Sequence, residues 1–161
     1  MKPVQKFRKC PGTYVFFILL SFLATGCSQG KTDYYHRFNN QVWQRFNILS
    51  FEVPVEKTGV PYDILFFAHH TKEYEYDNLD FNMVMTTPSG EERIREYTFT
   101  LKRYGSFTGK CNGDSCEAVI PVKTDITFSK KGILKIEIEN LVPRLEIKGL
   151  LGVGIRIVPK G

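Results

Sequence analysis

Residues 132–140 read Gly-Ile-Leu-Lys-Ile-Glu-Ile-Glu-Asn, and this stretch decides the fold. Leu134, Ile136 and Ile138 alternate with charged residues. Such period-two alternation predicts a β-strand with one face in a core and one in water. The same alternation occurs in residues 51–55, 62–69, 79–86, 97–102, 118–122 and 151–158. We therefore predict an all-β protein, a single antiparallel β-sandwich of jelly-roll-like form.

The connections agree with antiparallel pairing. The turn at residues 87–90, Thr-Pro-Ser-Gly, joins two of the expected strands into a hairpin. Residues 140–148 alone favour a helical turn, which Pro143 keeps short. Gly152 and Gly154 leave one face of the last strand bare, and this predicts close approach by a neighbouring loop.

The N-terminus has the layout of an export signal. Lys2, Lys6, Arg8 and Lys9 precede an apolar run from Tyr14 to Ala24, and no acid lies among them. This run is about half of the ~20 residues that a spanning helix needs, so a retained transmembrane helix is not expected. Leu-Ala-Thr-Gly-Cys at 23–27 then resembles the bacterial lipoprotein box, in which the cysteine receives a lipid.

These features predict three parts. Residues 1–26 form a lipoprotein signal peptide, residues 27–33 the lipidated Cys27 and its tether, and residues 34–161 the β-sandwich domain. The alternative is an ordinary cleaved signal in which Cys27 is incidental. Several acyl chains on Cys27 would hold the protein firmly to a membrane.

The net charge changes once the signal is removed. The chain has 22 basic and 17 acidic residues, a net charge of +5. Removing the four basic residues of the signal leaves 18 basic against 17 acidic residues. Nucleic-acid binding therefore has no support from composition.

Cys111 and Cys116 remain after processing, in an oxidising compartment. They flank a turn that contains Asn112-Gly113, so we predict a hairpin that brings the sulfurs within bonding distance. Zinc binding is the weaker alternative, because the pair lacks two-residue spacing and few histidines remain. We expect no metal site.

No catalytic motif was found, and the carboxylates of residues 73–77 crowd one loop instead of facing each other. We therefore predict a non-enzymatic protein without a cofactor or small-molecule substrate. Aromatic residues give the remaining hint. Trp43 is expected to cap the core, whereas Tyr74 and Tyr76 either cap it or contact a partner.

Several segments, in order along the chain, resemble the gliding-motility lipoprotein GldH family of Bacteroidetes. They include Tyr34-Tyr35, Tyr74 to Leu79, Pro88-Ser89-Gly90, Gly105 to Gly109, Ile120-Pro121 and Pro143-Arg144, with the closing run from Gly149 to Arg156. Two positions depart from the family pattern: Glu75 stands where Pro is usual, and Phe107 where Trp is common.

The resemblance implies a lipid-anchored component of the gliding machinery that works with other gliding or type IX secretion envelope proteins. In a cell that does not glide, the role would be envelope assembly or secretion. We expect a periplasm-facing domain on the outer or inner membrane. The expected partner-binding residues are Tyr74, Tyr76, Asn78, Arg144 and Arg156. The alternative function is a periplasmic or surface glycan-binding module that uses loop aromatics.

Overall fold

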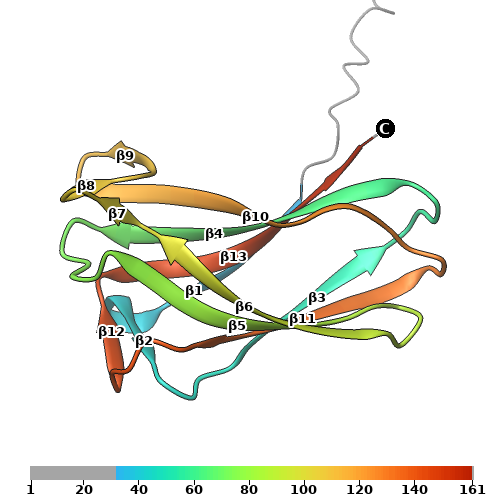
Figure 1. The fold of residues 1–161 in the computed structure, drawn as a ribbon, viewed down its shortest axis with the longest axis horizontal. Helices are drawn as coiled ribbons and strands as arrows, with labels where there is room; N and C mark the ends of the chain where they lie inside the picture. Colours follow the sequence, from blue (N-terminus) through green and yellow to red (C-terminus); the bar gives the residue numbers. More distant parts are fainter. Residues whose placement is uncertain (1–31, 161) are drawn as a thin grey trace, which may run out of the picture.

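The structure, a computed structural model, describes residues 32–160 and is a two-layer antiparallel β-sandwich (Figure 1). The five-stranded sheet has the order β1 (Thr32–Arg37), β13 (Leu150–Pro159), β4 (Pro61–Thr71), β10 (Ser115–Thr127) and β9 (Lys110–Asn112). The four-stranded sheet has the order β3 (Leu49–Val55), β11 (Gly132–Asn140), β5 (Asn78–Thr86) and β6 (Glu92–Thr100). The predicted fold class is confirmed.

Two small sheets complete the chain. β2 (Val42–Gln44) pairs with β12 (Glu146–Lys148), and β7 (Lys102–Arg103) pairs with β8 (Ser106–Phe107). A short 3-10 turn, η2 (Asn39–Gln41), precedes β2. β2, β8, β9 and β12 gather at one end of the sandwich, opposite the C-terminus (Figure 1).

The alternating apolar side chains meet between the two sheets. Leu134, Ile136 and Ile138 are fully buried, as the alternation predicts. Phe66 of β4 stacks on Phe81 of β5 with 4.2 Å between ring centroids, which ties one sheet to the other. No helix in the described part of the chain is long and apolar enough to cross a membrane.

Three expectations about local structure are corrected. The predicted helical turn at residues 140–148 is wrong: this segment crosses between the sheets, and Glu146–Lys148 forms β12. Because Ile147 is buried and its two neighbours are exposed, the segment follows the strand period. β1 begins at Thr32, so residues 32 and 33 belong to the sandwich and not to the tether. The expected strand at residues 118–122 is part of the longer, bulged strand β10, which extends from Ser115 to Thr127.

The expected lipidation site, Cys27, and the signal peptide lie outside the described residues.

Candidate interaction surface

The loop from Tyr74 to Asn78 is anchored in the core. Tyr74 is fully buried, and its hydroxyl donates a hydrogen bond to the Asn78 carbonyl oxygen at 2.8 Å. Burial raises the pKa of the Tyr74 phenol. The Tyr74 side chain therefore does not offer a partner contact, which corrects our expectation for this residue. Tyr76 is half-buried and meets the Tyr74 ring edge-on at 5.8 Å between centroids.

A backbone contact explains why this loop lies so deep. Gly149 adopts φ +81°, and a Cβ atom there would lie 2.6 Å from the backbone nitrogen of Tyr74. The Gly149 carbonyl oxygen also accepts a hydrogen bond from the Thr71 amide at 2.8 Å. A glycine is therefore required at the junction between β12 and β13, which contacts the loop from Tyr74 to Asn78.

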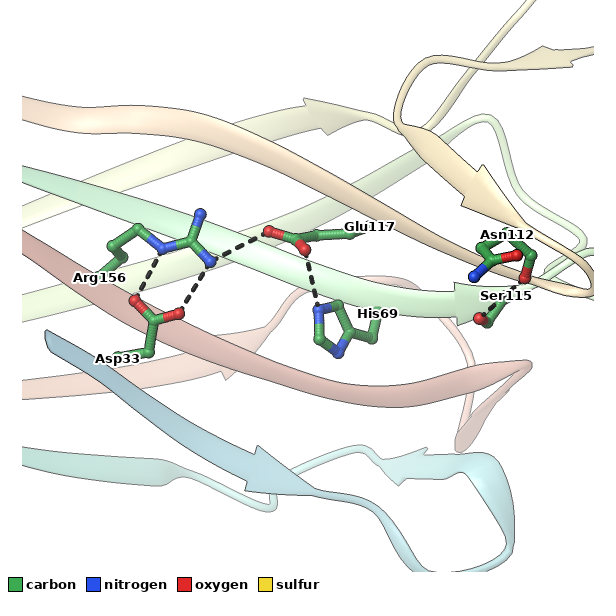
Figure 2. Close-up of polar contacts among 6 residues, drawn as sticks. All are labelled: Asp33, His69, Asn112, Ser115, Glu117 and Arg156. Carbon is green, nitrogen blue, oxygen red and sulfur yellow. Dashed lines mark hydrogen bonds and ion pairs between the residues drawn. The ribbon is translucent and has the colours of Figure 1, made fainter. Parts of the chain in front are cut away.

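Arg156 lies on the outer face of the five-stranded sheet, within an ionic network (Figure 2). Its guanidinium donates two hydrogen bonds to the Asp33 carboxylate, at 2.7 and 2.8 Å, and a third to Glu117 at 3.1 Å. Only 12% of its side chain is exposed, and the bond to Asp33 raises its pKa. Because Asp33 belongs to β1, Arg156 fastens the first strand to the sheet, and these bonds leave little of its side chain accessible to a partner.

Gly152 and Gly154 of β13 lie on the same outer face, where neighbouring side chains leave no room for a Cβ atom. A Cβ atom on Gly154 would lie 2.4 Å from the Phe67 ring, and one on Gly152 would lie 2.3 Å from the Tyr35 hydroxyl. Side chains of the neighbouring strands, not a loop, occupy the space that the glycines leave. Tyr35 stacks on Phe67 with 5.9 Å between centroids and remains 43% exposed.

The cysteine hairpin adjoins this face. Cys111 and Cys116 are directly opposite in the pairing of β9 with β10 and form a disulfide bond. The reversal takes place at Gly113 and Asp114, with Gly113 at φ +62°. Near this hairpin, His69 lies 3.5 Å from Glu117 (Figure 2). The adjacent His70 is fully buried. The two imidazoles thus lie on opposite faces of β4.

Four exposed apolar side chains lie in two loops at one end of the sandwich. They come from the β2–β3 loop and the β11–β12 loop, which are joined by a hydrogen bond from the Arg45 amide to the Leu145 carbonyl oxygen at 2.8 Å. We define the apolar tip as the exposed residues Phe46, Ile48, Leu141 and Leu145. Leu145 is 77% exposed and Phe46 71%. Arg144, a predicted partner-binding residue, is exposed beside Leu145.

Phe46 is held outward by a strained backbone. It adopts φ +66°, in the left-handed region that bulky L-residues avoid. The β2–β3 turn is anchored to the core, because the indole N–H of the fully buried Trp43 donates a hydrogen bond to the Asn47 carbonyl oxygen at 3.0 Å. The Asn140 side chain likewise donates to the Gln44 carbonyl oxygen at 3.2 Å. Strain that the surrounding structure maintains is typical of functional positions.

A polar groove of about 570 Å³ lies beside the apolar tip. Amide side chains dominate its walls: Asn39, Asn40, Gln44 and Asn47. Arg37 and Glu146 add one charge of each sign. The groove and the tip share the β2–β3 turn, so the end of the sandwich offers hydrogen-bonding groups next to exposed apolar surface.

Sequence reasoning missed the apolar tip. The available signal was the pair Phe46 and Ile48, with Leu141 and Leu145, in segments that follow no strand alternation. Large apolar residues outside a periodic pattern either cap a core or form a contact surface. Among residues 32–160, no cluster of three or more His, Cys, Asp or Glu side chains could hold a metal ion.

The chain is thus an all-β sandwich with exposed apolar loops at one end. The model of the GldH lipoprotein family matches residues 31–157, and the chain belongs to this family of gliding-motility lipoproteins. The family is not one of enzymes, and its members are membrane-anchored envelope proteins.

The other comparisons add little. No curated protein matches the chain. One solved structure, of TmCBM61 in complex with β-1,4-galactotriose, is similar at 18% identity and a TM-score of 0.32. The similarity covers 81% of this chain and 69% of that one. A likeness this weak carries no functional argument.

Proposed function

We propose that this protein is a lipid-anchored, non-enzymatic component of the gliding machinery that binds another envelope protein through its apolar tip. The observation that supports this most directly is Phe46, a 71% exposed aromatic side chain held in a strained backbone conformation. Phe46 contacts the Arg45 guanidinium, and exposed aromatic and arginine side chains are enriched in protein interfaces.

The position of the tip fits a protein tethered at its N-terminus. Thr32 pairs with Ile157 and lines a cavity with Val53 and Glu56, at the end of the sandwich away from the tip. Five residues from Cys27 to Thr32 reach at most about 17 Å, whereas β4 alone, with 11 residues, spans about 35 Å. A lipid on Cys27 would therefore hold the end of the sandwich opposite the tip close to the membrane and leave the tip free to reach a partner.

Site-specific cross-linking tests the docking proposal in cells. A photoreactive phenylalanine analogue at position 46 should yield a discrete cross-linked product containing another envelope protein. The same analogue at Val119, which is exposed on β10 of the five-stranded sheet, is the matched control. The absence of a product at position 46, or identical products at both positions, would contradict docking through the tip.

The anchor has its own test. Cys27→Ser should move the protein from the membrane fraction to a soluble or unprocessed form. If fractionation stays unchanged, the lipoprotein box has been misread. Protease accessibility in intact and permeabilised cells then decides whether the domain faces the periplasm, as we propose.

The polar groove favours a second candidate, a glycan-binding module. Its four amide side chains offer donors and acceptors suited to sugar hydroxyls. Calorimetric titration with envelope polysaccharides should then show saturable binding that Asn39→Ala weakens. Heats that do not saturate would remove this candidate.

A further inference from the structure

Two arginines of the edge strand β6 point into the gap between the sheets. Arg93 lies directly opposite Met85, and Arg95 opposite Met83. Residues opposite one another in an antiparallel pair project to the same face. Because both methionines are buried in the core, the two arginines lie on the interlayer side of β6.

A third cation reaches the same place from the other sheet. Lys123 of β10 lies between two irregularities in the pairing with β4. It lines a cavity of about 240 Å³ together with the two arginines, the two methionines and Tyr97. The Tyr97 hydroxyl closes one side by donating to the Val122 carbonyl oxygen at 2.8 Å, which bridges the sheets. We call this cavity the cationic notch.

The positive charge of the notch is only partly balanced. Arg93 pairs with Glu91 at 2.8 Å, and this bond, with a contribution from the charge of Lys123, lowers the pKa of the Glu91 carboxyl. Within residues 32–160, neither Arg95 nor Lys123 forms an ion pair. The notch therefore combines an apolar methionine floor with two cations open to an incoming anion.

The backbone beside the notch is also open. β6 is the last strand of its sheet, so its outer edge presents unpaired amide and carbonyl groups. An extended peptide can add to such an edge, with every second side chain directed toward the notch. On the notch side of β6, Arg93 and Arg95 favour acidic side chains of a partner and would repel the same arginines of a second copy. Glu92 and Glu96 lie on the other face.

We propose that the β6 edge and the cationic notch bind an extended segment of a partner protein in which acidic and apolar side chains share one face. The carboxylates meet Arg95 and Lys123, and the apolar side chain lies on Met83 and Met85. This proposal deepens the proposed function, since it adds a second docking surface with a stated partner chemistry.

The test uses labelled peptides and the purified mature protein. The probe is Thr-Glu-Thr-Leu-Thr-Glu-Thr, whose Glu and Leu side chains share one face when the peptide is extended. One control probe carries Gln in place of Glu, and another carries Pro at the central Thr positions. Fluorescence anisotropy should show saturable binding of the acidic probe, at least tenfold weaker for the Gln probe and for the Pro probe.

Variants locate the site. Arg95→Glu and Lys123→Glu should each weaken binding of the acidic probe at least tenfold, whereas Arg103→Glu, an exposed arginine outside the notch, should change it less than twofold. Circular dichroism melting verifies that each variant is folded; if Lys123→Glu is not, Lys123→Gln replaces it, with at least a threefold loss expected.

Four results would overturn the proposal: no binding of the acidic probe, equal binding of the Gln probe, equal binding of the Pro probe, or an equal loss in Arg103→Glu. Sedimentation with anionic vesicles that depends on Arg95 while the peptide fails would assign the notch to a lipid surface instead. The assay contains no tip partner, so its failure leaves the position 46 cross-linking result standing, and the reverse also holds.

Discussion

Phe46→Gly and Phe46→Ala together separate the strain of the backbone at this position from the contacts of the ring. Both variants lose the ring and its contact with the Arg45 guanidinium, 5.3 Å from the ring centroid. They differ in the cost of φ +66°: an L-residue is disfavoured there by about 1–2 kcal/mol, whereas glycine is not. Glycine loses about 0.5–1 kcal/mol of this advantage, because it has more conformational freedom than alanine in the unfolded chain.

The difference predicts that Phe46→Gly is more stable than Phe46→Ala by about 0.5–1 kcal/mol, or roughly 2–4 °C in melting temperature for a domain of this size. Thermal unfolding followed by circular dichroism measures it. Binding through the tip should be lost in both variants, so the glycine variant would be the more stable of two inactive proteins. Loss of binding without loss of stability is what a position strained for function predicts.

Ile48 supplies the matched control, because it is 55% exposed in the same loop but does not have a positive φ. There the order should reverse, with Ile48→Gly less stable than Ile48→Ala by about 0.5–1 kcal/mol. If glycine is no better than alanine at position 46, the backbone is not strained and the argument from strain to function fails.

Three further predictions concern the core and the outer face. Gly154→Ala should lower stability by about 1–3 kcal/mol, because the new Cβ would lie 2.4 Å from the Phe67 ring; a melting temperature within 1 °C of the original would refute this. Burial lowers the pKa of His70, so at acidic pH the unfolded chain binds a proton that the folded protein does not. The free energy of unfolding should therefore decrease as the pH drops below about 6.5. His70→Phe should flatten urea-derived stability between pH 6.5 and 4.5, and an unchanged slope would assign the effect to other groups. Arg156→Met should cost about 1–2 kcal/mol by removing the paired bonds to Asp33, and unfolding in denaturant that matches the unmodified protein would show that the network contributes nothing.

The sandwich could be predicted from the sequence because its strands alternate strongly. In β11, the alternation from Leu134 to Ile138 shows which side chains point into the core and which point to solvent. This can be read from one strand alone, without knowing which strands lie beside it. β2 and β12 could not be found this way. Each has three residues, which is too short to show a period, and their pairing exists only because the chain crosses between the sheets there.

The proposed interaction surface was harder to predict from the sequence, because the exposure of a side chain depends on tertiary neighbours that the sequence does not identify. Tyr74 and Phe46 are both aromatic residues in loops, yet one is fully buried and the other 71% exposed. The difference lies in the close approach of Gly149 to the backbone of Tyr74, a contact across 75 positions of sequence. The sequence likewise does not reveal that Arg156 is bound by Asp33, because that pairing depends on the addition of β1 to the sheet beside β13.

The proposed anchor and the proposed docking tip would together set how force passes through the domain. A lipid at Cys27 would pull on Thr32, while a partner at the tip would hold the other end. β1 runs between them, in register with β13 from Thr32 to Arg37. Tension along a paired strand loads its hydrogen bonds together instead of one after another, so β1 resists as a unit. The bidentate bond between Arg156 and Asp33 lies at the first residues of β1, so it would reinforce the strand at the point where the proposed anchor pulls on the fold.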